Sequence, residues 1–357
     1  MQDHLRSGGT ERQAVLLARG FTRAGHDCTL LTFRPGGALA ADLSGVKHYT
    51  LQARDWGLDW FAPGLLRHLR RAQPDLVLCL GRMANCYGAS LQRALPRAVV
   101  IATLRTGKRL PWLFRRSLRV VRHVVANSHE AKLAISTELH LDPTRVTVIH
   151  NSLVFPPTGP SARNEALRAA HGAGPDTIVL LCVAMFRPEK NQRALIEIVR
   201  GLPESIDWRL WLAGDGPARI ACEALATQAG LDARVRFCGW MADPTALYHA
   251  ADLAVLTSTR ESLSNFLIEA QAHGLPVVAS VARGVAEAFA PNESGYLVAA
   301  GDTEGFRQRL VTLATDHAHR RQMGARARNY AREHFSPERQ LQAYLDLFEA
   351  LRSPAAS

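Results

Sequence analysis

The chain has 357 residues, of which 47% are hydrophobic and 21% are charged, as in globular proteins. This length exceeds the roughly 250 to 300 residues at which a single core stops growing, so we expect two domains. No apolar stretch reaches the roughly 18 residues that span a bilayer, and "MQDHLRSGGTERQ" lacks the apolar centre of a signal peptide, so we expect neither a spanning helix nor export.

The net charge of +11 is concentrated in the first part of the chain. Residues 1–155 contain 22 Lys and Arg against 10 Asp and Glu, whereas the remaining residues contain 21 against 22. This basic part favours an anionic partner. The six cysteines are widely spaced and form no C-x-x-C pattern, which indicates reduced thiols in a cytosolic protein rather than disulfides or zinc.

The beginning of the chain predicts a glycine turn followed by a helix. In "SGGTERQAVLLARGFTRAGH", Thr10 and Gln13 are placed for a capping box and Gly25 for the C-terminal stop. An α/β fold places a strand before such a turn, yet "MQDHLRS" has only Met1 and Leu5 as large apolar residues. We therefore expect the first, normally central, strand to be missing. Either the native reading frame begins upstream with an apolar segment, or another strand fills the gap.

From about residue 28, short apolar runs alternate with longer amphipathic ones, which is the pattern of parallel sheets covered by helices. The predicted strands of the first half are 28–33, 75–80, 98–104, 120–126 and 145–150. The Pro/Gly/Ser-rich stretch 155–165 predicts a linker. The strands predicted after it are 177–186, 208–214, 234–239, 251–258, 276–280 and 295–300. The expected fold class is α/β, with two doubly wound Rossmann-like domains.

Two glutamates surround the start of a predicted helix in "TSTRESLSNFLIEAQAHGLPVVAS", residues 257–280. A helix beginning near Ser264 would direct its free N–H groups and positive dipole end to the carboxyl edge of the sheet, which suits a diphosphate. Glu261 would lie in the loop before the helix. Glu269 would lie about 7.5 Å along it, where its carboxylate could accept hydrogen bonds from sugar hydroxyls. The alternative is that both glutamates only favour the helix dipole.

The spacing Glu261-x7-Glu269, followed by "HGLPVVAS", resembles the E-x7-E motif of the family 4 retaining glycosyltransferases of GT-B fold. Further similar stretches occur in order along nearly the whole chain: "GGTERQAVLLARGFTRAGHDCTLLT", "VVANSHEAK", "VIHNS", "LLCVAMFRPEKN", "LWLAGDGP" and "RVRFCGWMADPTALYHAADLAVLTSTRE". The resemblance implies two Rossmann-like domains facing an interdomain cleft. Residues 1–155 would bind the acceptor and 156–335 the nucleotide sugar, and a C-terminal helix, 336–357, would pack back toward the first domain.

The resemblance also implies a donor site. Glu261 would contact hydroxyls of the donor sugar, Glu269 would take the ribose hydroxyls, and Lys190 would neutralise phosphate charge. Backbone groups from both domains would hold the sugar and diphosphate; they belong to Gly8, Gly9, Leu263, Ser264, Asn265 and Phe266. Cations and helix amides of this kind stabilise the charge that develops on a departing nucleoside diphosphate.

The sequence departs from the family pattern before Lys190. The family has Gly-Arg five to six residues earlier, where this chain has Ala184-Met185. We predict that Arg187 supplies the missing cation and acts in catalysis with Glu261 and Lys190. The alternative is an arginine at a helix entry that faces solvent.

Other polar residues at strand ends are candidates for contact with the acceptor or a phosphate. Some family members have a histidine after the strand that matches 98–104, and Arg105 occupies that position here. Arg82 and Asn85 follow the strand 75–80. We expect all three side chains to lie at the carboxyl edge of the first sheet.

No D-x-D motif accompanies these stretches, and "AGDGP" is typical of a tight turn, so we expect neither a metal nor another cofactor. The expected substrate is a nucleotide sugar, with UDP favoured over GDP, that gives a hexose-type sugar to a glycan or lipid-linked acceptor in cell-surface polysaccharide or lipopolysaccharide synthesis. The resemblance implies front-face attack, in which the leaving phosphate oxygen helps to take the acceptor proton. No carboxylate nucleophile is identified.

The stretch "RTGKRLPWLFRRSLRVVR", residues 105–122, is basic and contains no acidic residue. Apolar residues lie between the basic ones, and its aromatic residues could enter the headgroup boundary, so we predict docking on an anionic membrane. The predicted membrane patch consists of Lys108, Arg109, Trp112, Phe114, Arg115, Arg116 and Arg119. The alternatives are a solvated basic face whose aromatics pack inward, or a patch that binds a soluble anionic glycan. The expected location is the cytoplasm, with peripheral attachment to the inner face of the cytoplasmic membrane.

Two other functions remain open from the sequence. A sugar-nucleotide epimerase of the same fold would need no acceptor. A non-catalytic binder of membrane or nucleic acid would use the basic first half, with salt-dependent binding that survives Glu261→Ala. Charge asymmetry does not explain the motifs of the second half, so we expect glycosyl transfer and no nucleic-acid partner.

Overall fold

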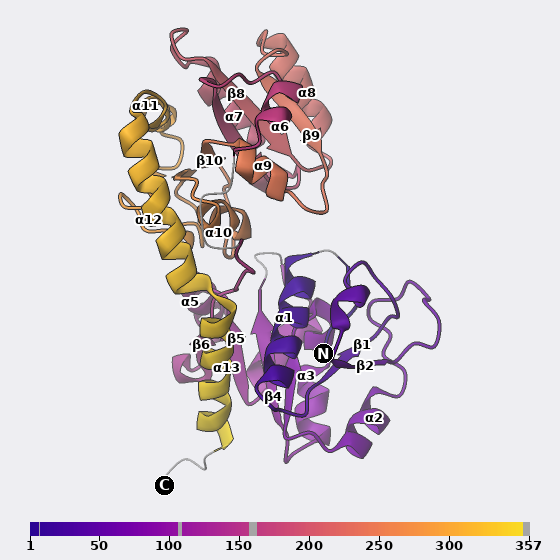
Figure 1. Cartoon of the computed structure of the whole chain (residues 1–357). Helices are drawn as coiled ribbons and strands as arrows, with labels where there is room; N and C mark the ends of the chain where they lie inside the picture. The colour runs from indigo at the N-terminus through magenta and orange to yellow at the C-terminus, as the bar shows by residue number, and fades with distance from the viewer. Residues whose placement is uncertain (7, 106–108, 157–162, 353–357) are drawn as a thin grey trace. The chain divides into compact units, whose positions relative to one another are not determined.

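The computed structural model describes residues 1–6, 8–105, 109–156 and 163–352, in two compact units (Figure 1). Unit 1 comprises Met1–Ser152 and Pro337–Ser357, and unit 2 comprises Leu153–Ser336. Lys108 of the predicted membrane patch and most of the predicted linker lie outside the described residues. No helix in the described ranges is long and apolar enough to cross a membrane.

The strands described in unit 1 all pair in parallel. Four of them form a sheet in the order β3-β4-β5-β6: Leu76–Cys79, Val99–Leu104, His123–Ala126 and Val146–Val148. A second sheet pairs β1, Thr29–Thr32, with β2, Lys47–Thr50. The sequence prediction missed β2, because its residues are mostly exposed and lack apolar alternation. The strand predicted from residue 120 begins only at His123, because Val120 ends helix α4.

No strand precedes the first helix in the described part of unit 1, as predicted, but the first residues lie between the two sheets. Gln2 forms a parallel bridge with Thr32. On the other side, the N–H of Leu80 donates to the carbonyl of Met1 at 2.9 Å. Residues 1–3 thus occupy the position of the expected central strand, and the gap is not filled by another strand.

The first helix, α1 (Gly9–Arg23), starts differently from the prediction. Its N-cap is Gly8, and no side chain caps it. The predicted capping box is wrong because Gln13 is buried and bonded elsewhere: its Oε1 accepts the N–H of Ser152 at 3.0 Å. Gly25 at φ 87° follows the helix, as predicted.

Helices surround the sheets of unit 1. They are α1, α2 (Leu65–Ala72), α3 (Arg82–Ala94), α4 (Trp112–Val120), α5 (His129–Leu139) and α13 (Pro337–Arg352). Figure 1 shows the C-terminal helix α13 near α1. The buried ring of Tyr344 on α13 packs edge-on against Phe21 on α1, with centroids 6.1 Å apart.

A buried histidine of unit 1 gives a pH prediction. His123 on β5 is bonded to the hydroxyl of Thr147 at 2.9 Å, and burial lowers its pKa from 6.5 to about 4, with Arg145 and Lys132 adding to the effect. Between these values the unfolded chain binds a proton that the folded chain does not, so stability falls as the pH falls from 6.5 toward 4.

We expect His123→Gln to reduce the loss between pH 7 and pH 5 by about 2 kcal/mol, since one pKa unit corresponds to about 1.4 kcal/mol. Urea unfolding of both proteins at pH 7 and pH 5 measures the difference. Equal losses for both proteins would show that His123 is not the responsible group.

Unit 2 contains one six-stranded parallel sheet in the order β12-β11-β10-β7-β8-β9. Its strands are β7 (Ile178–Val183), β8 (Trp208–Ala213), β9 (Val235–Gly239), β10 (Leu253–Leu256), β11 (Val277–Ser280) and β12 (Gly295–Val298). Numbered from β7, this is the 3-2-1-4-5-6 order of the doubly wound fold. The topological switch point lies between β7 and β10, and the predicted α/β fold class is confirmed.

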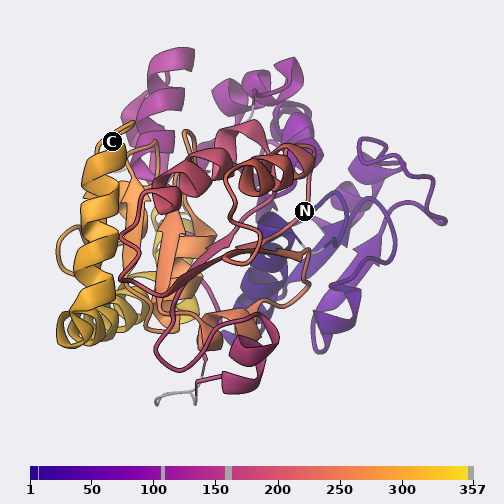
Figure 2. The ribbon, with the colours of Figure 1, turned by 90° about the horizontal axis from the view of Figure 1, so that it is seen from above.

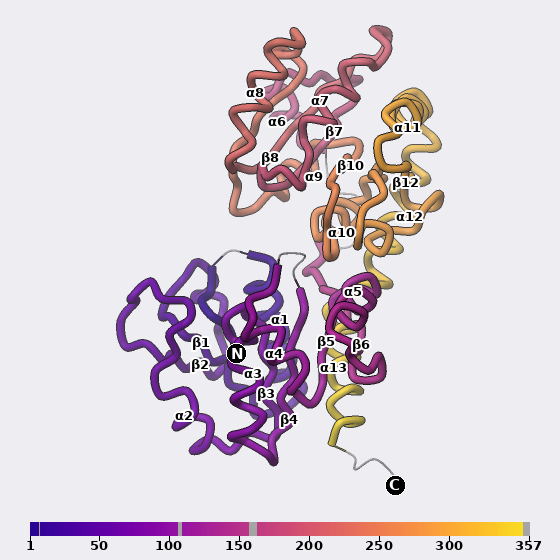
Figure 3. Tube along the Cα trace, turned by 180° about the vertical axis from the view of Figure 1, so that it is seen from behind, coloured from indigo at the N-terminus to yellow at the C-terminus, as the bar shows by residue number. Residues whose placement is uncertain are grey.

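Helices cover the sheet of unit 2, and α12 lies beside α10 (Figures 1 and 3). Figure 2 shows the orange strands beside the gold helices that follow them in the chain. The helices are α6 (Glu165–Ala170), α7 (Gln192–Arg200), α8 (Arg219–Gln228), α9 (Thr245–Ala250), α10 (Asn265–Ala272), α11 (Thr303–Thr315) and α12 (His317–Phe335).

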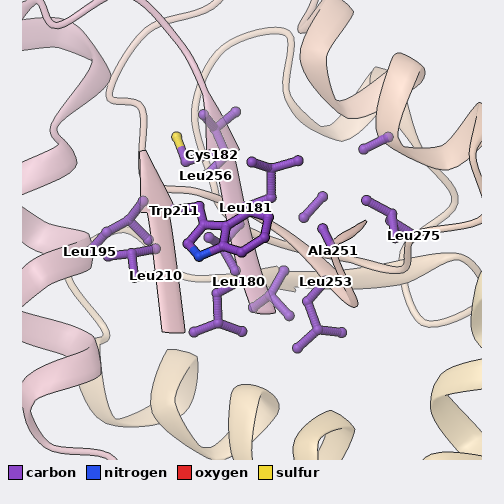
Figure 4. Packing of buried hydrophobic residues seen from close by; sticks show 14 of the residues in the cluster. Leu180, Leu181, Cys182, Leu195, Leu210, Trp211, Ala251, Leu253, Leu256 and Leu275 are labelled. Carbon is purple, nitrogen blue, oxygen red and sulfur yellow. The ribbon is translucent and has the colours of Figure 1, made fainter. Parts of the chain in front are cut away.

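The core of unit 2 is built on the central strands. Trp211 of β8 is fully buried and lies among leucines of its own strand and of β7, including Leu210, Leu180 and Leu181 (Figure 4). Continuous apolar runs are expected for strands that are covered on both faces. This packing fixes the strand ends from which the site loops leave.

Candidate functional site

Two loops meet at the switch point of unit 2, where parallel strands of this order place ligands. One loop follows β7 and the other follows β10. The hydroxyl of Thr257 donates to the carbonyl of Asn191 at 2.9 Å, and the N–H of Thr259 donates to the carbonyl of Glu189 at 2.8 Å. These bonds hold the loops together at the carboxyl edge of the sheet.

Glycines in adjacent loops permit this close packing. Gly214 follows β8 at φ 139°, and a Cβ there would lie 2.1 Å from the carbonyl oxygen of Ala184. Gly284 follows β11 at φ 70°, and a Cβ there would lie 2.1 Å from the carbonyl oxygen of Ser262. Both glycines therefore have a left-handed φ and no room for a side chain, which explains "AGDGP" as a supporting turn.

The structure brings Lys190 and Glu261 together. Lys190 ends a short 3-10 helix, Pro188–Lys190, and its Nζ lies 2.5 Å from Oε1 of Glu261. The side chains are only 23% and 9% exposed. The backbone of Glu261 is fixed as well, because its N–H donates to the carbonyl of Arg283 at 3.1 Å. A lysine and a glutamate distant in sequence thus form one ion pair at the switch point.

Helix α10 begins beside this pair. Its N-cap is Ser264, so the predicted start is confirmed, and neither a side-chain cap nor an acidic residue occupies its first turn. The first N–H groups of a helix have no intrahelical acceptor, and the dipole is positive at this end. Leu263, Ser264 and Phe266 are buried and Asn265 is half-buried. This end of α10 is suited to an anion.

Glu269 lies further along α10 and is held by a residue that sequence reasoning missed. The hydroxyl of Tyr248, on α9, donates to Oε2 of Glu269 at 2.7 Å. The Tyr248 ring is buried and stacks near Phe266, with centroids 6.3 Å apart. The only sequence signal was the position of Tyr248 in the stretch "TALYHAADLAVL" that shares the family resemblance.

Arg187 lies just before the 3-10 helix, in extended conformation, and is half-buried. Within the described residues its guanidinium forms no hydrogen bond or ion pair. An available cation there is compatible with the predicted role. Two apolar residues after β9, Trp240 and Met241, are exposed at the same edge of the sheet and were not singled out from the sequence.

Three of the unit 1 candidates, Gly8, Gly9 and Arg82, are exposed. Gly8 and Gly9 lie at the start of α1. Arg82 donates to the carbonyl of Arg109 at 2.9 Å.

The other two unit 1 candidates form hydrogen bonds within the unit, and the prediction for Asn85 is corrected. Asn85 is buried, and its amide oxygen accepts the N–H of Thr103 at 2.9 Å. Its amide nitrogen donates to the carbonyl of Gly81 at 2.8 Å, so Asn85 joins strand ends and is not available to an acceptor. Arg105 donates to Asn151 and, at 2.7 Å, to the hydroxyl of Tyr344. The second bond connects Arg105 to α13, and its contact with an acceptor or phosphate stays a prediction.

The predicted membrane patch is only partly exposed. Phe114 is 1% exposed and packs in the core, which corrects its predicted insertion into a membrane. Arg115 is paired with Glu138. Trp112 is 69% exposed, and the guanidinium of Arg116 lies over its ring at 5.6 Å from the centroid. Arg109 and Arg119 are exposed. An amphipathic helix directs one aromatic residue inward and the other outward.

Comparison with known proteins gives two family matches. The model of "Glycosyltransferase Family 4" matches residues 7–153, and the model of "Glycosyl transferases group 1" matches residues 163–330. The chain is 29% identical over 96% of both chains to lipopolysaccharide core biosynthesis glycosyltransferase LpsE of Rhizobium meliloti (strain 1021). It is 32% identical to LpsD of the same strain over 57% of each chain.

Solved structures share the fold. The crystal structure of Anabaena Alr3699/HepE in complex with UDP and glucose has a TM-score of 0.80 at 22% identity, over 98% of each chain. The lipopolysaccharide outer core galactosyltransferase WaaB has a TM-score of 0.73 at 16% identity, over 96% of each chain. The two family models match the two parts of this chain in order, and the chain belongs to the family 4 type of glycosyltransferase with GT-B fold.

Proposed function

We propose that this glycosyltransferase transfers a hexose-type sugar from a UDP-sugar to a glycan or lipid-linked acceptor, with retention of configuration. The observation that supports it most is the Lys190–Glu261 ion pair at the switch point of unit 2, beside the uncapped start of α10. A cation and the amides at a helix N-terminus suit the diphosphate, and a carboxylate suits sugar hydroxyls. One site therefore combines the groups that a nucleotide sugar requires.

In this proposal the diphosphate binds to the backbone N–H groups of residues 263–266 and to Lys190, and Arg187 adds a second cation. Glu261 accepts from Lys190 through Oε1, so Oε2 remains for a hydroxyl of the donor sugar. Glu269, positioned by Tyr248, takes the ribose hydroxyls. Unit 2 thus binds the donor. Unit 1 binds the acceptor.

The proposed reaction needs no nucleophile from the protein. The bond between the anomeric carbon and the diphosphate oxygen breaks, and the acceptor hydroxyl oxygen bonds to the same face of that carbon. The acceptor proton passes to the leaving phosphate oxygen. Lys190, Arg187 and the start of α10 stabilise the negative charge that develops on the diphosphate.

The names of similar proteins support the choice of substrates. LpsE and LpsD are named for lipopolysaccharide core biosynthesis, and the HepE complexes contain UDP or UDP-glucose. We therefore place the reaction in cell-surface polysaccharide or lipopolysaccharide synthesis, in the cytoplasm.

The donor and the stereochemistry can be tested on one sample. A panel of nucleotide sugars is screened for a rise in melting temperature, since a ligand that binds only the folded state stabilises it. The nucleotide sugar that binds is then incubated with a lipopolysaccharide-core acceptor, and the anomeric configuration of the product is read by NMR. We expect a UDP-sugar and retention. An inverted product would contradict the proposed mechanism, and a response to GDP-sugars alone would contradict the donor.

Lys190→Ala should distinguish phosphate contact from base or sugar contact. We expect it to weaken UDP-sugar binding about 10- to 100-fold, because one charge-assisted contact is lost, and to leave uridine binding unchanged. Calorimetric titration with both ligands provides the measurement, and Lys132→Ala in unit 1 is a control for the loss of a positive charge. If Lys190→Ala weakens the binding of the UDP-sugar and of uridine equally, Lys190 does not contact the phosphates.

Peripheral membrane binding is proposed for the exposed part of the patch, formed by Arg109, Trp112, Arg116 and Arg119. Each basic residue near an anionic surface contributes about 1 kcal/mol. Trp112→Ala with Arg116→Glu should abolish flotation with anionic liposomes at low salt, whereas Arg93→Glu, an exposed arginine on α3, should not. If wild type does not bind anionic liposomes, the acceptor should be sought among soluble anionic glycans.

A further inference from the structure

A cavity of about 530 Å³ opens at the amino edge of the unit 2 sheet. Its wall includes Ile178, the first residue of β7, Asp252, just before β10, and Pro276, just before β11. Because these strands are parallel, this edge lies opposite the edge that carries Lys190 and Glu261. The cavity is separate from the proposed donor site, and its volume is typical of small-molecule sites.

The wall of the cavity is strongly basic. It contains three histidines and four arginines, against only two aspartates. The arginines are Arg163, Arg320, Arg321 and Arg328. Such a concentration of positive charge in a concave surface raises the local potential and favours an anionic ligand.

The more buried of the two aspartates neutralises this wall only in part, because it also has buried partners of its own. Asp252 accepts the N–H of Val179 at 2.8 Å and an N–H of Arg168 at 3.0 Å. Arg168 is fully buried behind the pocket. Arg163 of the wall also contacts Asp252 at 3.1 Å, so this carboxylate is shared between one wall arginine and the buried Arg168, and the other three wall arginines outnumber the one remaining aspartate. Asp176, the other aspartate, is exposed.

Helix α12 contributes the remaining arginines. Nη1 of Arg320 donates to the carbonyl oxygens of Leu313 and Ala314, at the end of α11. Burial lowers the pKa of Arg320, as expected for a cation with restricted access to water. Arg321 forms no hydrogen bond or ion pair within the described residues. Arg328 lies seven residues later and therefore on the same face of the helix.

The arginine-bearing helix is held firmly at the pocket. A Cβ at Gly324 of α12 would lie 2.2 Å from the carbonyl oxygen of Gly274, which follows the C-cap residue of α10. Nη2 of Arg328 donates to the carbonyl of His273 at 3.1 Å. In addition, Nε2 of His249 is buried without a hydrogen-bond partner. A fixed basic wall with a buried, unpartnered imidazole nitrogen has the properties of a formed site, since buried polar atoms are normally bonded.

We infer that this pocket is a second ligand site, which binds a small phosphorylated molecule of the size of a sugar phosphate. Guanidinium groups form paired, charge-assisted hydrogen bonds with phosphate oxygens, which explains the use of several arginines. The volume admits one such molecule and not a long polyanion. The inference goes beyond the proposed transfer reaction, because none of these arginines belongs to the donor site.

The pocket is connected to the proposed donor site through α9 and α10. Tyr248 lines the pocket, stacks on His273 with centroids 4.8 Å apart, and donates to Glu269. A ligand that shifts Tyr248 or His273 would therefore change the position of Glu269. We expect the pocket ligand to alter the affinity for the nucleotide sugar, and Tyr248→Phe to reduce that effect while pocket binding persists.

The test is calorimetric titration of the full chain with inorganic diphosphate, at constant ionic strength and with saturating UDP to fill the donor site. We expect one binding site. Arg321→Glu and Arg328→Gln should each raise the dissociation constant about tenfold or more, the effect of a lost charge-assisted contact. Arg326→Glu is the matched control, because Arg326 is exposed on α12 and does not line the pocket. Ribose 5-phosphate should bind where ribose does not.

Three results would overturn the inference: no diphosphate binding in the presence of UDP, equal weakening by Arg321→Glu and Arg326→Glu, or loss of binding in Lys190→Ala. Circular dichroism checks that each variant is folded. If UDP itself does not bind, the proposed donor site is wrong. The pocket can still be tested in that case, because diphosphate binding to Arg321→Glu and Arg326→Glu can be compared without UDP. If the affinity for the nucleotide sugar is the same with and without the pocket ligand, Tyr248 does not connect the two sites.

Discussion

Replacing Glu261 with alanine is expected to lower kcat/KM at least about a thousandfold, or roughly 4 kcal/mol of transition-state stabilisation. The change removes the carboxylate proposed to hold the donor sugar. It also leaves the half-buried ammonium of Lys190 without its partner at 2.5 Å, so that the phosphate-binding cation is no longer held in position. Both losses act at the same point of the site.

Folding should be largely preserved in this variant, because Glu261 lies in a loop and not in the core of unit 2. The matched control is Glu197→Ala, an exposed glutamate on α7 whose partner Arg200 is 3.8 Å away. Initial rates over a range of donor concentrations separate kcat from KM. Glu261→Gln keeps the size and loses the charge, and we expect it to be nearly as inactive. Near-normal turnover in either Glu261 variant would show that the site assignment is wrong.

Replacing Arg168 with methionine is expected to cost unit 2 about 3 to 5 kcal/mol of unfolding free energy, the usual result of breaking a buried ion pair. The side chain is 0% exposed and donates to the carbonyl oxygens of Ala250 and Gly174, at 2.7 and 2.9 Å. It also pairs with Asp252, which fixes the start of β7 through the N–H of Val179. Methionine fills part of the volume but supplies none of these donors.

Arg163→Ala is the control for Arg168→Met. Arg163 contacts the same carboxylate, but its side chain is 37% exposed, and exposed ion pairs contribute about 1 kcal/mol or less. Hydrogen exchange of peptides from β7 and β10 in increasing urea reports on unit 2 separately from unit 1. If the two variants lost similar stability, the buried network around Arg168 would not support unit 2 as described.

The central strands of unit 2, β7, β8, β10 and β11, were predictable from the sequence because they are largely buried, so they appear as nearly continuous apolar runs. β2 was missed for the opposite reason: its side chains are largely exposed and give no pattern. The beginning of α10 was predictable from local signals, since Ser264 is a favoured N-cap residue and precedes a helical apolar run.

The site was predictable only where the resemblance supplied a motif. No spacing rule joins Lys190 to Glu261, because their contact depends on the strand order that places β7 beside β10. Asn85 was misassigned because a polar residue at a strand end has the same pattern whether it binds a ligand or bonds to backbone groups. Phe114 and Trp112 are two positions apart, and only the packing of α4 shows which one is buried.

The most direct test of the proposed donor site is an amide NMR titration of the deuterated chain with UDP. We expect the largest shifts at residues 263–266, at the start of α10, and at residues 187–190, with much smaller shifts at the amino edge of the unit 2 sheet. Saturation with shifts confined to other residues, and none at the start of α10, would contradict the proposed donor site.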